Sequence, residues 1–364
     1  MSMNPISTTK TIKDDYCSYL ESLMQVRSNA INLKAKEAIG NSEFVKGPYL
    51  ELTPPFETGG SLKSLIDSGY ASAEFIGMLN YDVLNRPLYQ HQEQAFLKIA
   101  EQHRNLIVST GTGSGKTECY LYPIFDYLMK EKEKGLLGPG VRALLLFPMN
   151  ALANDQVKRL RELLEQYPDI TFGRYTGETL KEKDLAYQQY VEKYNKEPLP
   201  NELLSRKEMH ATPPNILLTN YAMLEYLLLR PAASMLFDGW HGRTWKFIVL
   251  DEAHTYKGSS GTEIAYLLRR LKDRICSNER GKITCIATSA TLGDVSKLGE
   301  LAEFATNIFD EHFDTDDIIL SKRIYNDTMD GLENLEPHYY EGLLSRVMDI
   351  EEESDKEIFC FENL

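Results

Sequence analysis

The feature that most limits how this chain can fold is a glycine-rich turn between an apolar run and a helix-like segment. The apolar run covers residues 105–110, the turn covers residues 111–117 and reads GTGSGKT, and a helical pattern follows it. Glycines allow backbone N–H groups to face inward as an anion-binding nest, at the positive end of the following helix. The order of strand, turn and helix therefore predicts a phosphate-binding loop within an α/β fold.

The residue types in this loop predict ATP and Mg²⁺ as the bound cofactors. Lys116 is expected to reach the β- and γ-phosphates, and the Thr117 hydroxyl is expected to bind Mg²⁺. The general motif has a glycine at position 110, where this chain has a threonine. A glycine-rich turn that binds nothing is the alternative. The predicted nucleotide-binding residues of the loop are Thr110, Gly111, Thr112, Gly113, Ser114, Gly115, Lys116 and Thr117.

A second motif follows the apolar run Phe247–Leu250 and reads DEAH. A carboxylate at the end of a strand can hold the Mg²⁺ that bridges the phosphates, and Asp251 is placed for that role. Glu252 can orient and deprotonate the attacking water. Adjacent carboxylates repel each other unless a cation lies nearby, so their pairing favours a metal site over a simple helix cap. The predicted catalytic residues are Lys116, Asp251, Glu252 and His254, with Thr117 and Asp251 as metal ligands.

Short apolar runs alternate with helical patterns from residue 89 onward. Continuous apolar runs bounded by turns are typical of parallel strands that helices cover on both faces. The chain is therefore predicted to form a doubly wound parallel α/β sheet, with the motifs at one edge. The predicted strands are Asn105–Thr110, Ala143–Phe147, Phe172–Tyr175, Ile216–Thr219, Phe247–Leu250 and Ile283–Ala287.

These motifs, in this order, resemble those of superfamily 2 DExH-box (DEAH) helicases over residues 48–325. The resemblance implies a RecA-like domain of the P-loop NTPase class. The block LYQHQ at residues 88–92 resembles the adenine-recognition motif of that family. By this resemblance Gln92 would hydrogen-bond the adenine, and Tyr89 or Arg86 would pack on the ring.

Three further blocks resemble the motifs that couple ATP to nucleic acid in that family. They are LFPMNAL at 146–152, TN at 219–220 and SAT at 289–291. Small hydroxyl and amide groups at helix N-termini suit phosphate oxygens. Each block also has a plain structural alternative, because such residues can cap helices and a proline can end a strand. The predicted nucleic-acid and coupling residues are Pro148, Asn150, Thr219, Asn220, Ser289 and Thr291.

The phrases GTGSGKTE, LFPMNALANDQ, DEAHTYKGSSGTE and SATLGD are similar to the bacterial branch of mitomycin-repair and large helicase-related proteins. Related motors occur in phage defence. This branch implies DNA rather than RNA as the partner, with RNA remodelling as the alternative. Nothing after residue 291 resembles the second RecA-like lobe, whose arginines complete the ATP site, and neither Arg323 nor Arg346 is assigned that role. We therefore expect a half-motor, whose second lobe comes from another chain or from a missing C-terminal part.

Three segments are predicted along the chain. Residues 1–47 form a helical extension with an amphipathic helix from Asp14 to Ile39, and residues 48–309 form the nucleotide-binding domain. Within that domain, residues 178–212 are expected to be a charged helical insertion without strands. Residues 310–364 form an acidic segment, either a solvated linker or a docking segment. This segment holds 17 of the 54 acidic residues and 4 of the 40 Lys and Arg residues. The rest of the chain is therefore near neutral, so a net charge of -14 does not exclude a local nucleic-acid groove.

Cysteine usage and hydropathy limit the cellular compartments in which the protein is expected. The five cysteines form no CxxC pair, which disfavours a zinc site or a disulfide framework and fits a reducing cytoplasm. No run of about 18 apolar residues is present, and the first residues lack the pattern of a secretory signal. The sequence predicts a cytoplasmic protein with no membrane segment.

Overall fold

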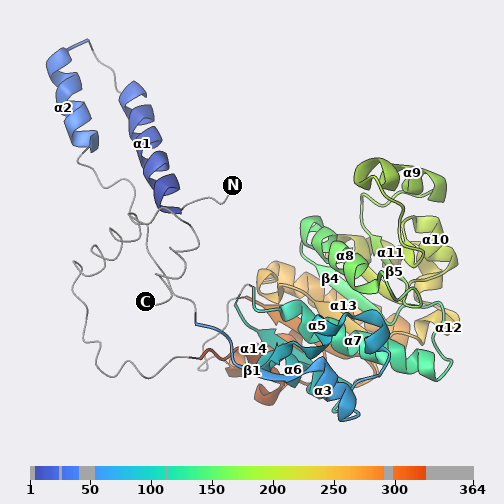
Figure 1. Ribbon diagram of the computed structural model, residues 1–364. Coiled ribbons are helices and arrows are strands. Elements are labelled where there is room, and N and C mark those ends of the chain that lie inside the picture. The colour runs from blue at the N-terminus through green and yellow to red at the C-terminus, as the bar shows by residue number, and fades with distance from the viewer. Residues whose placement is uncertain (1–4, 24–26, 41–53, 112, 291–297, 325–364) are drawn as a thin grey trace. The chain divides into compact units, whose positions relative to one another are not determined.

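The computed structural model describes residues 5–23, 27–40, 54–111, 113–290 and 298–324 (Figure 1). The chain divides into two compact units, Met1–Pro54 and Pro55–Leu364. The predictions for Thr112, Thr291 and the residues after 324 fall outside the described residues. Of the helices described, none combines the length and apolar character that a membrane crossing needs.

The described residues of the first unit, 5–23 and 27–40, form two helices rather than the single helix expected from Asp14 to Ile39. They are α1 (Pro5–Leu23) and α2 (Asn29–Gly40), and an ion pair of 3.1 Å joins Lys36 to Glu21. The single-helix prediction is wrong because the pair Ser28-Asn29 interrupts the pattern. Short polar side chains of this kind compete for backbone hydrogen bonds and favour helix starts over helix interiors.

The second unit is built on an eight-stranded parallel sheet, which confirms the predicted α/β fold. The strand order is β10-β3-β9-β8-β4-β7-β5-β6. The six predicted strands are all present within two residues of their expected ends. The strands are β3 (Leu106–Ser109), β4 (Ala143–Phe147), β5 (Phe172–Tyr175), β6 (Glu202–Leu203), β7 (Ile216–Asn220), β8 (Phe247–Leu250), β9 (Thr284–Ser289) and β10 (Ile318–Leu320).

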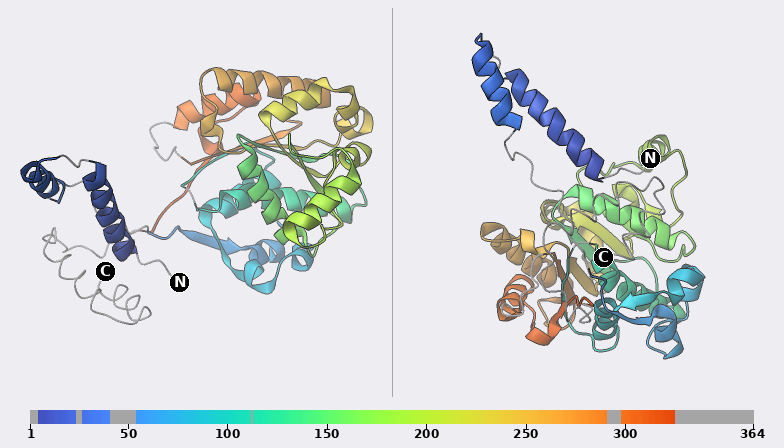
Figure 2. Two further views of the ribbon diagram at one scale, coloured as in Figure 1. Left: turned by 90° about the horizontal axis from the view of Figure 1, so that it is seen from above. Right: turned by 60° about the vertical axis from the view of Figure 1, so that its left-hand side comes forward.

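Helices cover both faces of this sheet, as the left view of Figure 2 shows. On one face lie α6 (Gln90–Ala100), α7 (Lys116–Glu133) and α8 (Asn150–Leu164); on the other lie α11 (Tyr221–Leu229), α13 (Ser259–Cys276) and α14 (Leu298–Phe309). In β4, Leu145 and Phe147 pack into the first layer, and Leu144 and Leu146 pack into the second. The continuous apolar runs seen in the sequence are therefore explained by burial on two sides.

Smaller elements precede and connect these layers. An antiparallel pair, β1 (Thr58–Ser61) and β2 (Pro87–Tyr89), leads into α6, and α3 (Leu62–Asp67), α4 (Phe75–Met78) and α5 (Tyr81–Asn85) lie between its strands. Leu62 and Phe75 are fully buried in the same core layer as α6 and α7. The remaining short elements are α12 (Gly239–Gly242) and the 3-10 turns η1 (Pro231–Leu236), η2 (Ala253–Thr255) and η4 (Thr315–Asp317).

The insertion at 178–212 contains α9 (Lys183–Tyr194), strand β6 and α10 (Arg206–Ala211). The prediction that it lacks a strand is wrong, because β6 pairs in parallel with β5 through Phe172 and Glu202. A charged residue in a two-residue strand carries no apolar signal. Here Arg161 neutralises the Glu202 carboxylate through two hydrogen bonds of 2.8 and 2.7 Å, which allows its burial at the sheet edge.

The sheet also extends past residue 309, where the sequence placed the end of the domain. Strand β10 pairs with β3, and the buried ammonium of Lys272 pairs with Glu311 and with two carbonyls just before it. The boundary at 309 is therefore too early. The acidic composition of the segment conceals the apolar run Ile318–Leu320.

Residues 55–57 and 322–324 form a short antiparallel contact that we call the terminal clamp. Its hydrogen bonds run from Glu57 N to Lys322 O and from Ile324 N to Pro55 O, both at 2.9 Å, around a bridge between Phe56 and Arg323. The clamp joins the chain that enters this unit to the chain that follows β10.

Candidate nucleotide and nucleic-acid site

The glycine-rich loop connects β3 to α7, as its sequence predicts. Gly113 and Gly115 have φ angles of 74° and 72°, a region that strongly favours glycine, and α7 begins at the next residue, Lys116. The Ser114 hydroxyl donates to the Gly111 carbonyl at 2.8 Å and also pairs with the Thr110 hydroxyl. The loop is thus curled tightly before the helix N-terminus, the shape that an anion site requires.

Two side chains from α6 hold the loop from behind. His91 Nε2 donates to the Ser114 carbonyl at 2.7 Å, and Gln92 Nε2 donates to the Gly115 carbonyl at 3.1 Å. Gln92 Oε1 accepts a hydrogen bond of 2.9 Å from the backbone N–H of Tyr89. Burial lowers the pKa of His91, although its bond to Ser114 opposes the shift, so the ring is neutral at ordinary pH. Adenine recognition by Gln92 and Tyr89 stays a prediction, since Gln92 bonds the loop here and the Tyr89 ring packs against Phe56 and His91.

Replacing Gly115 by alanine is expected to lower the free energy of unfolding by about 2–5 kcal/mol. The left-handed backbone costs a residue with a Cβ about 1–2 kcal/mol, and overpacking adds about 1–3 kcal/mol. The collision is specific, because a Cβ on Gly115 would lie 2.3 Å from Gln92 Nε2. Urea denaturation without nucleotide measures the loss.

Gly113→Ala is the matched control for this substitution. Its φ is also positive, but a Cβ there would meet nothing within 4 Å, so only the backbone cost of about 1–2 kcal/mol remains. Adding Gln92→Ala to Gly115→Ala should restore part of the lost stability. Equal losses for the two glycine variants would contradict the contact between α6 and the loop.

The DEAH motif lies at the carboxyl end of β8, with β9 between it and the strand of the loop. Asp251 is buried, and burial raises the pKa of its carboxyl although the Thr288 hydroxyl donates to it. The same Thr288 oxygen accepts the backbone N–H of Glu252 at 3.1 Å. Glu252 has a φ of 49°, which costs a residue with a Cβ roughly 1–3 kcal/mol and is typical of functional sites.

The loop and the DEAH motif meet through an ion pair. Lys116 Nζ lies 3.3 Å from Glu252 Oε1, and His254 Nδ1 lies 3.2 Å from Glu252 Oε2. The Thr117 hydroxyl accepts a bond of 3.4 Å from Gln156 of α8. The structure therefore brings all four predicted catalytic residues, and the predicted metal ligand Thr117, to one edge of the sheet.

These residues fit a triphosphate and a divalent cation. Asp251 is a buried carboxylate, and among the described residues no lysine or arginine lies within ion-pair distance of it. Burial of such a carboxylate is unfavourable unless a cation compensates it. Thr117 and Asp251 would hold Mg²⁺, and Lys116, which pairs with the Glu252 carboxylate, would exchange that partner for phosphate oxygens.

Of the predicted nucleic-acid contacts, Asn150 and Asn220 come together. Asn220 Nδ2 donates to Asn150 Oδ1 at 2.8 Å, and Asn220 Oδ1 accepts the Met223 N–H at 2.8 Å. Asn220 is therefore also a helix cap, the structural alternative raised for it. Pro148 is half-buried in the turn between β4 and α8.

Two other predicted contacts are buried. The Thr219 hydroxyl is fully buried and donates to the Tyr175 carbonyl at 2.6 Å, so it faces the sheet interior rather than an open edge. Ser289 ends β9, and its carbonyl accepts the Thr110 N–H at 3.1 Å. Ser289 thus ties the coupling block directly to the start of the phosphate loop.

Residues 89–298 match the family model described as DEAD/DEAH box helicase. The chain belongs to the DEAD/DEAH box helicase family. The matched range of this chain includes both predicted nucleotide motifs and all three predicted coupling blocks.

Alignments with individual helicases of this family show what share of each relative's length the chain matches. The Druantia protein DruE of Escherichia coli is 30% identical over 392 aligned positions, covering 83% of this chain and 21% of DruE. The uncharacterized ATP-dependent helicase YprA of Bacillus subtilis is 34% identical over 216 positions, covering 58% of this chain and 24% of YprA. The solved structure of the DUF1998 helicase MrfA bound to DNA and AMPPNP aligns with a TM-score of 0.53 and 25% identity, over 78% of this chain and 33% of MrfA. The chain spans about a quarter of the length of the curated relatives it matches.

Sequence reasoning missed several residues of this helicase site. The Thr288 hydroxyl donates to the Asp251 carboxylate and accepts the backbone N–H of Glu252, His91 holds the loop, and Gln156 reaches Thr117. Arg323, which the sequence treats as isolated, lies 4.7 Å over the Phe56 ring, and Phe56 packs edge-on against Tyr89. Thr288 and His91 adjoin motif residues in the sequence, which is a usable signal. The sequence around Arg323 carries no such signal, because it is the pairing of the terminal clamp that brings Arg323 close to the phosphate loop.

Proposed function

We propose that this chain is the first RecA-like lobe of an ATP-driven DNA helicase or translocase. The observation that carries the proposal is that Lys116, Asp251 and Glu252 gather at the sheet edge that also bears Asn150 and Asn220. One edge thus offers groups for a nucleotide and groups for a nucleic-acid backbone. A motor requires both sites on a shared set of strands, so that one can respond to the other.

Each residue has a definite role in this proposal. Lys116 would bind the β- and γ-phosphates, while Thr117 and Asp251 would hold Mg²⁺, which neutralises charge on the phosphates when bound. Glu252 would orient a water and accept its proton, and His254, whose Nδ1 lies 3.2 Å from Glu252 Oε2, would lie beside the carboxylate. Gln92 and Tyr89 would meet the adenine, as in the related motif.

Asn150 and Asn220 would contact the backbone of one strand. Contacts of this kind are independent of base sequence, so the substrate is nucleic acid of any sequence. The solved relative MrfA is bound to DNA, which supports DNA over RNA. The similarity to mitomycin-repair and defence-related helicases supports a role in bacterial DNA repair or phage defence.

We further propose that this lobe needs a second RecA-like lobe for full turnover. A sheet of this kind supplies a lysine and two carboxylates, but the arginines that complete the site belong to the opposing lobe. The described residues contain one such sheet, and the chain matches only 21% of the length of DruE and 24% of the length of YprA. A lobe that binds ATP and DNA yet turns over only with its partner is the second candidate function.

ATP hydrolysis by the full chain, with and without single-stranded DNA or RNA of one sequence, tests these proposals. Glu252→Gln is expected to lower any turnover by roughly 10²- to 10⁴-fold, because the water loses its base, while nucleotide binding persists. DNA-stimulated turnover that Glu252→Gln abolishes would support a complete motor. Nucleotide binding with turnover indifferent to DNA would support the half-motor, and stimulation by RNA alone would exclude the DNA assignment.

A further inference from the structure

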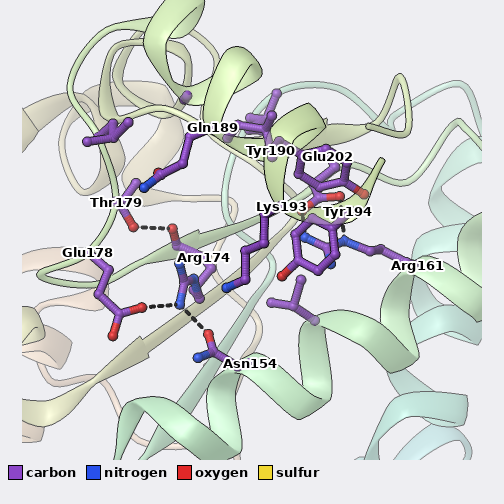
Figure 3. A pocket seen from close by; sticks show the side chains of 15 residues that line it. Asn154, Arg161, Arg174, Glu178, Thr179, Gln189, Tyr190, Lys193, Tyr194 and Glu202 are labelled. Atoms are coloured by element: carbon purple, nitrogen blue, oxygen red, sulfur yellow. Dashed lines mark hydrogen bonds and ion pairs between the residues drawn. The ribbon is translucent and has the colours of Figure 1, made fainter. Parts of the chain in front are cut away.

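A polar cavity of about 300 Å³ lies beside the insertion, between α8 and α9, and we call it the α8–α9 pocket (Figure 3). Its walls come from α8, β5, the loop at 178–180, α9 and β6. Asn154 and Arg161 are seven residues apart on α8, and Gln189 and Lys193 are four residues apart on α9. Each pair therefore shares one face of its helix, turned toward the cavity.

One end of the pocket is fixed by Arg161. Its guanidinium makes two hydrogen bonds to Glu202, and both side chains are nearly buried. The same guanidinium lies 4.8 Å over the Tyr190 ring and 4.7 Å over the Tyr194 ring. This arginine and these two rings are already occupied by one another, so they form a rigid wall rather than a stacking surface for a base.

The other end of the pocket is continuous with the predicted nucleic-acid contacts. Arg174 donates to Glu178 at 2.9 Å and to Asn154, and Asn150 donates to the other oxygen of Glu178 at 3.3 Å. Because Asn220 donates to Asn150, an unbroken series of hydrogen bonds runs from the start of α11 into the pocket. The pocket therefore continues the predicted nucleic-acid surface by one turn of α8, from Asn150 to Asn154.

Between these two ends, the described residues leave a lysine without a carboxylate partner and a buried tyrosine hydroxyl without a hydrogen bond. Among the described residues, no carboxylate lies within ion-pair distance of Lys193, whose Nζ rests 5.3 Å from the Tyr194 ring centre. The Tyr190 side chain is 5% exposed, and its hydroxyl has no hydrogen-bond partner among those residues. Burial acts to raise the pKa of Tyr194, but hydrogen bonds and charge from Arg161 and Lys193 outweigh it and lower that pKa. The charged residues that line the pocket are Arg161, Arg174, Lys193, Glu178 and Glu202. Three are cations and two are carboxylates, so one positive charge is in excess, which favours binding of an anion.

We propose that the α8–α9 pocket binds a backbone phosphate of the nucleic-acid strand that Asn150 and Asn220 contact, with Lys193 as its principal cation. The proposal rests on the proposed function, and adds a contact from the insertion to those of the helicase motifs. A phosphodiester fits better than a base because the aromatic rings are covered by Arg161. It fits a strand better than a free anion because of the continuous connection to Asn150.

The test compares Lys193→Ala with Lys196→Ala in the full chain. Both lysines are exposed and removing either changes the net charge equally, but Lys196 does not line the pocket. Affinity for a fluorescent single-stranded DNA is measured from about 50 to 300 mM salt. Lys193→Ala is expected to weaken binding roughly three- to tenfold at low salt and to reduce the salt slope by about 0.7, the value for one phosphate on a single strand. Lys193→Glu should weaken binding further, and Lys196→Ala should have little effect.

Three outcomes separate the possibilities. Equal effects of the two alanine variants would overturn the pocket proposal and leave the proposed function intact, whereas failure of the unsubstituted chain to bind any oligonucleotide would overturn both. An oligonucleotide with uncharged methylphosphonate linkages should bind both variants equally if the ligand is a backbone phosphate. An effect of Lys193→Ala on the binding of inorganic phosphate alone, with DNA binding unchanged, would assign the pocket to a free anion and overturn the proposal.

Discussion

Lys116→Ala is expected to weaken the binding of Mg-ATP by roughly 10²- to 10⁴-fold. Charge-assisted hydrogen bonds contribute about 1.5–3 kcal/mol each, and this lysine would make at least two, to the β- and γ-phosphates. Each 1.4 kcal/mol corresponds to about a tenfold change in the dissociation constant. Isothermal titration with ATP and Mg²⁺, using the full chain, measures the loss directly.

The fold should survive this substitution. Without nucleotide, Lys116 makes an ion pair of 3.3 Å with Glu252, whose side chain is 22% exposed, so losing that one partner should lower the free energy of unfolding by about 1–3 kcal/mol. Lys158→Ala is the matched control, because it removes the same charge from an exposed position on α8. Unchanged affinity in Lys116→Ala would remove the phosphate-binding role from the loop.

Lys272→Ala is expected to lower the free energy of unfolding by about 3–5 kcal/mol. The Lys272 side chain is 1% exposed and the Glu311 side chain 2% exposed, so the substitution leaves a buried carboxylate without its cation. It also leaves the carbonyls of Phe309 and Asp310 without the donor they accept from at 3.0 and 3.1 Å. Urea denaturation followed by circular dichroism measures the change.

A nearby exposed pair provides the control. Arg280 pairs with Asp310 at 2.6 Å, but its side chain is 70% exposed, so Arg280→Ala should cost less than about 1 kcal/mol. The double variant Lys272→Met with Glu311→Leu should recover part of the stability, because no charge is left unpaired, although the carbonyls of Phe309 and Asp310 still lack their donor. A loss in Lys272→Ala no greater than in Arg280→Ala would show that the residues after 309 are not part of the folded unit.

Much of the sheet and the nucleotide site could be predicted from the sequence, because the signals there are local and strong. Strands buried on two faces have continuous apolar runs, and each motif directly follows one of them, as with Asp251 after β8. Parallel topology then requires the motifs to share one edge, which is why Lys116 and Glu252 meet despite a separation of 136 residues.

Predictions from the sequence were wrong where a residue distant in the chain determines the local structure. Strand β6 depends on Arg161 to neutralise Glu202, and β10 belongs to an acidic segment that Lys272 anchors. Thr219 illustrates a different limit. Its place beside Asn220 suggested a phosphate contact, but neighbouring residues at a strand end point in opposite directions, and Thr219 points inward.

The terminal clamp also sets how a mechanical load would enter this domain. Pro55 pairs with Ile324 and Glu57 pairs with Lys322, so the chain before Pro55 and the chain after Ile324 leave from the same end of the contact. Tension between those two chains would break the two hydrogen bonds of the clamp one after the other. It would not load both bonds at the same time. After the hydrogen bond from Ile324 to Pro55 breaks, the next groups to separate would be Phe56 and Arg323, and Phe56 packs against His91, which holds the phosphate loop. A pull on the flanking chains would thus reach the nucleotide loop before it reached the hydrophobic core.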